Sequence, residues 1–274
     1  MQFFSKKKQI DSGVPRTLFA EGPLASVRNA VAIASGKGGV GKSTLSVNLA
    51  VSLAAQGAAV GLLDADIYGP SIPLMAGVSE EPALSNEQRL LPVKAHGIGL
   101  MSIGFIAGRD APVIWRGPLL ARALQQFLHQ VEWGALDYLL IDLPPGTGDI
   151  PLTLSQSIAL SGAVVVTTPQ SVALEDVERG MAMFEKVEVD VLGVVENMSY
   201  YLCPHCDKRH EIFGKGGGRA AAKRNGVGFF GEVPLLEAIR SAGDGGRPAA
   251  LEKQYEPIFA PVAAGIVDQL RSLA

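Results

Sequence analysis

Residues 35–44, "SGKGGVGKST", decide the fold that this 274-residue chain is expected to adopt. The stretch follows an apolar run typical of a buried strand and precedes a pattern typical of a helix. It matches G-x-x-x-x-G-K-[ST], a loop whose backbone N–H groups and following helix N-terminus face phosphate groups. It therefore predicts a nucleotide-binding loop. A chance glycine-rich turn is a poor alternative, because strand, loop and helix occur in the required order.

The residues of this loop have separate expected tasks. Lys42 is expected to reach the β- and γ-phosphates of ATP, and the Ser43 hydroxyl is expected to coordinate Mg²⁺. The glycines let the backbone turn tightly, so that successive N–H groups point at the phosphates. The residues expected to bind ATP are Gly36, Lys37, Gly38, Gly39, Val40, Gly41, Lys42, Ser43 and Thr44.

A second lysine, Lys37, lies inside the loop and exceeds the cations that one set of phosphates needs. It is either a solvent-facing loop residue or a group that points at ATP bound by a second subunit, as an arginine finger does in trans. In the second case its charge would act on the transition state. The expected catalytic residues are then Lys37, Lys42, Asp66 and Asp142.

The rest of the chain alternates short apolar runs with longer helical patterns. The expected strands are 30–35, 59–64, 98–103, 138–142, 163–168, 191–197 and 228–233. The expected helices are 42–56, 118–133, 150–161, 174–187, 234–242 and 256–273. Continuous apolar strands with helical crossovers predict an α/β fold, a doubly wound, mostly parallel sheet flanked by helices. We expect residues 29–274 to form a single P-loop ATPase domain and residues 1–28 to be a partly ordered N-terminal extension.

Carboxylates follow two of the expected strands. Asp64 and Asp66 come after the second strand, and an Asp-x-Asp pair in extended chain places both side chains on one face. One would help to hold the Mg²⁺ shell while the other orients the attacking water; the alternative is two turn-forming aspartates. Asp142 follows four apolar residues and is expected to hold Mg²⁺ through its water shell.

Three further positions are expected near the nucleotide. Gly146, just after Asp142, would offer its backbone N–H to the γ-phosphate. The carboxamide of Asn197 would read the adenine edge, and the backbone around Pro234 would line the same pocket. Asn197 and Pro234 are equally compatible with ordinary loop positions.

The motifs taken together resemble those of a known family. "KGGVGKST", "DADIYGPS", "DLPPGTGD", "TTPQSVALEDVERG" and "ENMSYYLCPHC" followed by "IFGKGGG" are similar to the Mrp/ApbC iron–sulfur cluster carriers. These are P-loop ATPases with a deviant Walker A motif, related to the MinD and ParA type. The match runs from about residue 27 to residue 274 and includes 112–118, "PVIWRGP", to which we assign no chemical role. In that family glycine often follows the second cysteine, where this chain has Asp207.

The resemblance implies a homodimer in which Lys37 crosses to the partner's ATP. It also implies a labile four-iron four-sulfur cluster, bound by Cys203 and Cys206, shared between the subunits and transferred to apo-proteins. An iron–sulfur assembly scaffold would be a possible donor. Lys42 and Ser43 would then take the phosphate and Mg²⁺ roles, with Asp66 and Asp142 as the switch aspartates.

Cys203 and Cys206 are the two cysteines of the chain and lie in the expected metal-binding loop 200–218. Two thiolates are half of the four that an iron–sulfur cluster uses, and a two-fold symmetric dimer would supply the other half. The alternative is structural zinc within one chain, using both cysteines and His205 or His210, although no fourth ligand is evident. A redox pair is disfavoured because the cysteines do not open a helix after a first strand.

Composition narrows the choice of function. The chain carries a formal charge of −3 with a pI near 5.8, which is not the basic surface typical of nucleic-acid binding. No apolar stretch reaches the roughly 18 residues of a membrane span, and no secretory signal is evident. We therefore expect a cytoplasmic protein without a nucleic-acid or membrane partner. The leading hypothesis is an ATP-hydrolysing iron–sulfur cluster carrier; the alternative is a MinD/ParA-like positioning or partition ATPase with a structural zinc site.

Overall fold

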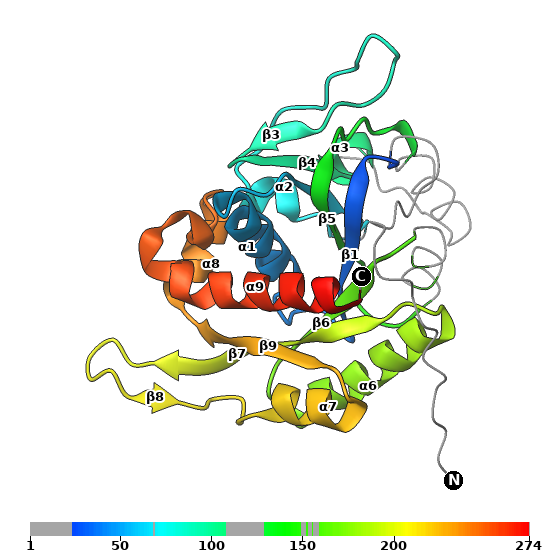
Figure 1. Ribbon diagram of the computed structural model, residues 1–274. Coiled ribbons are helices and arrows are strands. Elements are labelled where there is room, and N and C mark those ends of the chain that lie inside the picture. The colour runs from blue at the N-terminus through cyan, green and yellow to red at the C-terminus, as the bar shows by residue number, and fades with distance from the viewer. Residues whose placement is uncertain are drawn as a thin grey trace.

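A central sheet organises the computed structural model, which describes residues 24–67, 69–107, 129–148, 152, 155 and 159–273 (Figure 1). Within these residues the sheet has nine strands in the order β3-β4-β2-β5-β1-β6-β7-β8, and β9 also pairs with β7. The strands are β1 Val27–Ser35, β2 Val60–Asp64, β3 Val93–Ala95, β4 Ile98–Ser102, β5 Leu136–Asp142, β6 Gly162–Thr167, β7 Val191–Leu202, β8 Arg209–His210 and β9 Gly228–Leu235. All pairings are parallel except those of β3 and β8, so the predicted doubly wound, mostly parallel sheet is confirmed.

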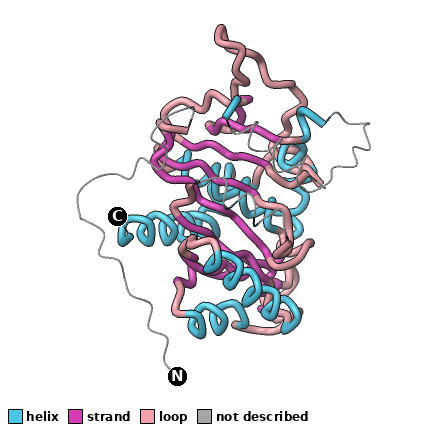
Figure 2. Tube along the Cα trace, turned by 90° about the vertical axis from the view of Figure 1, so that its right-hand side faces the viewer, coloured by secondary structure: helices cyan, strands magenta, loops and turns pink. Residues whose placement is uncertain are grey.

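Helices cover both faces of the sheet, giving three layers (Figure 2). The helices are α1 Lys42–Ala55, α2 Ile72–Met75, α3 Gly104–Ala107, α6 Ser171–Lys186, α7 Gly217–Asn225, α8 Glu237–Asp244 and α9 Glu256–Leu273, with short 3-10 turns at Ala249–Leu251 and Lys253–Tyr255. One apolar cluster joins the sheet to α6 and α7, and a second joins the other face to α1, α8 and α9. Strands buried on both faces explain the continuous apolar runs in the sequence.

Most predicted elements lie where expected, with three kinds of difference. The helix expected over 234–242 begins at Glu237, because Leu235 still pairs with Tyr201 as part of β9. The short strands β3 and β8 and the helices α2, α3 and α7 were not predicted. The 112–118 segment and most of the helices expected over 118–133 and 150–161 lie outside the described residues, as does the extension before residue 24. The proposed division into extension and domain therefore stays a prediction.

The carboxyl ends of β1, β2 and β5 meet at one edge of the sheet. Asp64 at the end of β2 and Ile33 of β1 both pair in register with Asp142 at the end of β5. Ligands of open α/β sheets bind at this edge, and here the phosphate loop lies directly after β1. No helix in the described part of the chain combines the length and apolar character needed to cross a membrane.

Candidate functional site

The phosphate loop connects β1 to α1 and depends on glycine at two positions. Gly39 and Gly41 have φ values of 80° and 82°, in the left-handed region that other residues rarely adopt. A Cβ atom on Gly41 would also lie 2.2 Å from Asn197 Nδ2, so no side chain fits between the loop and β7. The Asn197 Nδ2 group donates a 2.8 Å hydrogen bond to the Val40 carbonyl and fixes that approach.

Asp142 is the centre of a buried hydrogen-bond network at the start of α1. Its Oδ2 atom lies 2.6 Å from both Lys42 Nζ and Ser43 Oγ, while Oδ1 accepts a 2.6 Å bond from Ser46 Oγ. Lys42 is 5% exposed, and Asp142 and Ser46 are fully buried. The carboxylate and the Ser43 hydroxyl are oxygen donors of the kind that Mg²⁺ prefers. The structure therefore brings the predicted Lys42, Ser43 and Asp142 together, and adds Ser46.

Asp64, the last residue of β2, and Asp66, two residues later, do not share one environment. Asp66 lines the cavity beside the loop, with Oδ2 3.9 Å from Lys42 Nζ. Asp64 is fully buried and accepts hydrogen bonds from the backbone N–H groups of Asp66 and Ile72 and from the Ser102 hydroxyl. Desolvation, followed by the charge of Asp142, raises the pKa of Asp64 to about 7. In the structure Asp64 anchors the backbone at Asp66 and at Ile72, while Asp66 faces the cavity.

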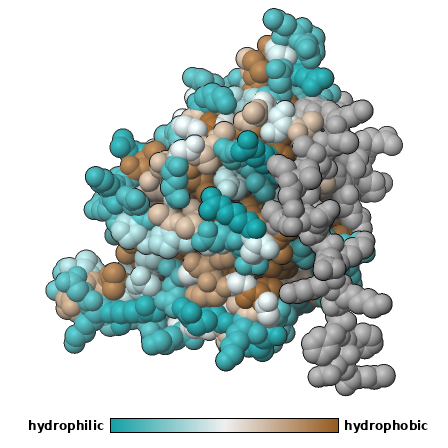
Figure 3. All heavy atoms as spheres, in the orientation of Figure 1, coloured by the Kyte–Doolittle hydropathy of each residue, from teal (hydrophilic) through white to brown (hydrophobic). Residues whose placement is uncertain are grey.

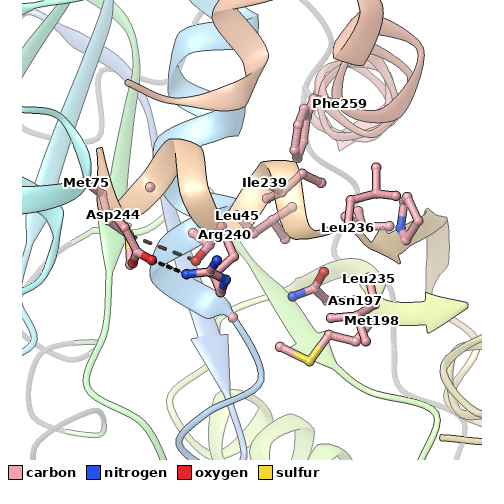
Figure 4. Close-up of a pocket in the computed structure, with 15 residues that line it drawn as sticks. Leu45, Met75, Asn197, Met198, Leu235, Leu236, Ile239, Arg240, Asp244 and Phe259 are labelled. Carbon is pink, nitrogen blue, oxygen red and sulfur yellow. Dashed lines mark hydrogen bonds and ion pairs between the residues drawn. The ribbon is translucent and has the colours of Figure 1, made fainter. Parts of the chain in front are cut away.

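Two adjoining cavities suit the two ends of a nucleotide. A polar cavity of about 170 Å³ is lined by the loop, by Asp66 and by Pro145. A more apolar cavity of about 310 Å³ adjoins it, and both are bounded by Gly41, Thr44 and Met75. Figure 4 shows Asn197, Met198 and Leu235 on one side of the larger cavity, with Arg240 paired to Asp244 on another. Pro234 also lines it, so the predicted Asn197 and Pro234 lie in the wall of one cavity.

Lys37 and Gly146 make contacts within the chain that the sequence did not indicate. Lys37 Nζ donates to Gln170 Oε1 at 3.2 Å, just before α6. The Gly146 N–H donates to the Ser35 carbonyl at 2.8 Å, which ties the loop after β5 to the end of β1. The N–H group expected to face a γ-phosphate is thus engaged by the main chain in this structure.

Both cysteines lie on a projection that we call the cysteine arm, residues 200–217. The end of β7 and the short β8 form a hairpin whose turn is closed by bonds from Cys203 N to Lys208 O and from Asp207 N to Cys203 O. Asp207 has φ 53°, in the left-handed region that glycine adopts most easily and that aspartate also tolerates. This explains why glycine suits the position and why aspartate can replace it. Figure 1 shows β7 and β8 running out side by side, away from the helical layers.

The arm is exposed and held by surface contacts. The Arg209 guanidinium lies 3.9 Å from the centroid of the Tyr200 ring and bonds to Glu232 at 2.9 Å. Ile212 and Leu202 are 57% and 41% exposed, and Figure 3 shows apolar atoms among polar ones on this projection at the lower left. Cys206 is exposed, and Cys203 is partly exposed.

The thiols form an incomplete ligand set in one chain. Hydrogen bonds from the His205 backbone N–H and from Cys206 lower the pKa of the Cys203 thiol, which favours the thiolate that binds metal. No group of three or more His, Cys, Asp or Glu side chains that could hold a metal occurs among the described residues. The closed zinc site considered from the sequence is therefore not assembled within this part of the chain.

The sequence did not indicate three polar residues: Ser46 and Gln170, which contact residues of the phosphate site, and Glu196, which lies outside both cavities. Ser46 lies three residues after Ser43 on the same face of α1, and that spacing was a usable signal because i and i+3 positions are neighbours on a helix. Gln170 immediately precedes α6 and binds Lys37, whereas the buried Glu196 lies within β7 and binds Gly218; both partners are distant in the chain. No local pattern indicated those contacts.

The comparisons agree with this geometry. The ParA family model, described as NUBPL iron-transfer P-loop NTPase, matches residues 26–270. A relative from Synechocystis sp., named iron-sulfur cluster carrier protein, is 52% identical over 252 residues, covering 90% of this chain and 71% of that protein.

Solved structures give the same picture. A nucleotide-binding protein from Archaeoglobus fulgidus, in complex with ADP, is 42% identical with a TM-score of 0.77 over 86% of this chain and 94% of that one. The cell division ATPase MinD of Pyrococcus furiosus, 22% identical with a TM-score of 0.64, shares the fold over 90% of this chain and 99% of its own. The resemblance drawn from the sequence motifs is confirmed.

Proposed function

This chain belongs to the ParA family of NUBPL iron-transfer P-loop NTPases, and from that membership we propose that it is an ATPase that carries an iron–sulfur cluster to acceptor proteins. One observation carries the proposal: the strand β7 links the phosphate loop to an exposed half set of thiolates. Its Asn197 contacts the loop, and its end leads directly into Cys203. Thiolates are the ligands that iron–sulfur clusters use.

Each part of the phosphate site has a proposed task. Lys42 would exchange its contact with Asp142 for the β- and γ-phosphates, since it already lines the polar cavity. Ser43 and Asp142 would hold Mg²⁺, directly and through water, and Ser46 would orient the carboxylate. Asp66, which faces the same cavity, would orient the attacking water. The main-chain N–H groups of the loop would hold the phosphates in place during hydrolysis.

The cluster is proposed as cargo of a homodimer. Cys203 and Cys206 of each protomer would supply two of the four ligands of a four-iron four-sulfur cluster. Lys37 would leave Gln170 and reach the partner's nucleotide in the same assembly. Opening the dimer would remove half of the ligands, which makes release to an apo-protein easy. A cytoplasmic location, and a scaffold as cluster donor, stay predictions.

The test is iron, sulfide and zinc per chain after anaerobic reconstitution, with the oligomeric state measured by sedimentation. The wild type is compared with the Cys203→Ser/Cys206→Ser double variant, and ATP affinity is measured for both as a control for folding. About two irons and two sulfides per chain in a dimer, lost in the variant at unchanged ATP affinity, is the expected result. One zinc per chain without sulfide would overturn the carrier function and leave the ATPase standing.

A further inference from the structure

Glu196 is a fully buried carboxylate that no step of the proposed mechanism uses. It lies on β7, with Oε1 accepting a 2.6 Å hydrogen bond from the Ser199 hydroxyl. Its Oε2 accepts a 2.5 Å hydrogen bond from the backbone N–H of Gly218 in the first turn of α7. A buried charged group retained in a sheet needs such partners, because its desolvation is otherwise costly.

The two donors lie at the two ends of the cysteine arm. Ser199 is the residue before the arm, and Gly218 is the residue after it. Gly218 approaches so closely that a Cβ atom there would lie 3.0 Å from Glu196 Cβ. The side chain of Glu196 therefore clamps the outgoing strand and the returning helix together at the base of the arm.

The neighbouring residue attaches the same point of β7 to the phosphate loop. Asn197 projects to the opposite face of the sheet, as strand alternation requires, and its carboxamide holds the Val40 carbonyl. Met198 follows with φ 53° and lines the larger cavity, where the β7–β9 register shifts between Asn197 and Tyr201. Two adjacent residues thus grip the arm and the loop from opposite faces.

We propose that Glu196 is a positioning residue that couples nucleotide binding at the phosphate loop to the order of the cysteine arm. Phosphates fix the loop through its N–H groups, and the loop fixes Asn197. Because Glu196 and Asn197 are adjacent on β7, a shift of the strand backbone that alters the contact of Asn197 with Val40 also displaces Glu196 relative to Gly218. The inference rests on the nucleotide binding of the proposed function and not on its iron–sulfur cargo.

The experiment follows the arm in the metal-free full chain, with and without ADP and Mg²⁺. Hydrogen exchange of residues 200–217 is measured together with alkylation, located by mass spectrometry. The chain has just two cysteines, so exposed Cys206 is an internal control for the partly exposed Cys203. In the wild type, nucleotide is expected to slow arm exchange and Cys203 alkylation at least about fivefold, the effect of one satisfied buried hydrogen bond.

Two variants of Glu196 separate coupling from folding. Glu196→Met keeps the length but removes both acceptors, and is expected to reduce the nucleotide effect below about twofold while ADP affinity stays within about twofold. Glu196→Gln is expected to keep the nucleotide effect on the arm, because the amide oxygen accepts from Gly218 N–H while the amide NH₂ donates to Ser199 Oγ. Gly218→Ala displaces the start of α7 and should weaken the nucleotide effect as Glu196→Met does. It replaces Glu196→Met in the experiment if that variant does not fold.

Two results would overturn the inference: a Met variant with the wild-type nucleotide effect, or a wild-type arm that does not respond to ADP it demonstrably binds. Failure of the proposed function appears separately. Absence of ADP binding would be seen in the affinity measurement, and absence of a cluster would leave this metal-free experiment unaffected.

Discussion

At the phosphate loop, Lys42 and Asp142 are 5% and 0% exposed, and each hydrogen-bonding atom of the Asp142 carboxylate has a partner from the same chain. On the cysteine arm Cys206 is exposed, and Arg209, itself 38% exposed, holds the hairpin through surface contacts. The buried hydrogen-bond network of the first region is formed within one chain, whereas the second region presents an unfinished ligand set. Buried, hydrogen-bonded side chains are thus concentrated where phosphate is proposed to bind, and exposed side chains where cargo is proposed to be exchanged.

The strongest test of this contrast removes the centre of the buried region. Asp142→Ala removes the 2.6 Å partner of the buried Lys42 and leaves it the more distant Asp66 carboxylate, at 3.9 Å; it should lower the free energy of unfolding by about 3–5 kcal/mol. The rate of ATP hydrolysis should also fall at least about 100-fold, because Ser43 and Lys42 lose their orientation. Urea unfolding and steady-state turnover measure the two effects. Asp142→Asn keeps an oxygen acceptor and is the control: its stability loss should be smaller with a similar loss of turnover.

The pH dependence of stability sharpens the same contrast. The pKa of Asp64 is about 7 in the folded chain against 3.8 for the ordinary side chain, so folding favours the protonated form. Its stabilising contribution is complete below pH 3.8 and is lost as the pH rises to 7, on the order of 4 kcal/mol in all. The difference in unfolding free energy between wild type and Asp64→Asn should therefore decline between pH 4 and pH 7. A difference that is flat over this range would contradict the assignment.

The smallest expected effect concerns the arm. Arg209→Ala removes ion pairs at a group that is 38% exposed, and should change the global unfolding free energy by less than about 1 kcal/mol. Hydrogen exchange within residues 200–217 should nevertheless accelerate, because Arg209 also covers the Tyr200 ring. Arg224→Ala, which removes an exposed pair with Glu178 outside the arm, is the matched control. A loss of several kcal/mol for Arg209→Ala would show that the arm is part of the core.

The sequence predicted what depends on local pattern. The phosphate loop, the strand before it, the helix after it and the position of Asp142 follow from the motif and from continuous apolar runs. Asp64 and Asp66 were expected on one face, but β2 ends at Asp64, so the alternation of side chains stops between them. The two-residue β8 is too short to leave a pattern. Helix α7 was missed because it begins in glycines that read as loop. The hydrogen bond from Gly218 N–H to Glu196 joins residues 22 positions apart, so no local sequence pattern indicates it.

The position of the cysteine arm within the fold has a consequence for its topology. β7, α7 and β9 form one parallel crossover, and the arm is an excursion between its strand and its helix. Ser199 and Gly218, both bound to one carboxylate, mark the points where the excursion leaves and rejoins. A shorter link between them would keep the β7–β9 pairing from Gly193 to Asn197 and would lose the pairing of Tyr201 with Leu235. The arm, which we propose to bind the cluster, thus has the topology of an insertion whose two ends are fixed by one carboxylate.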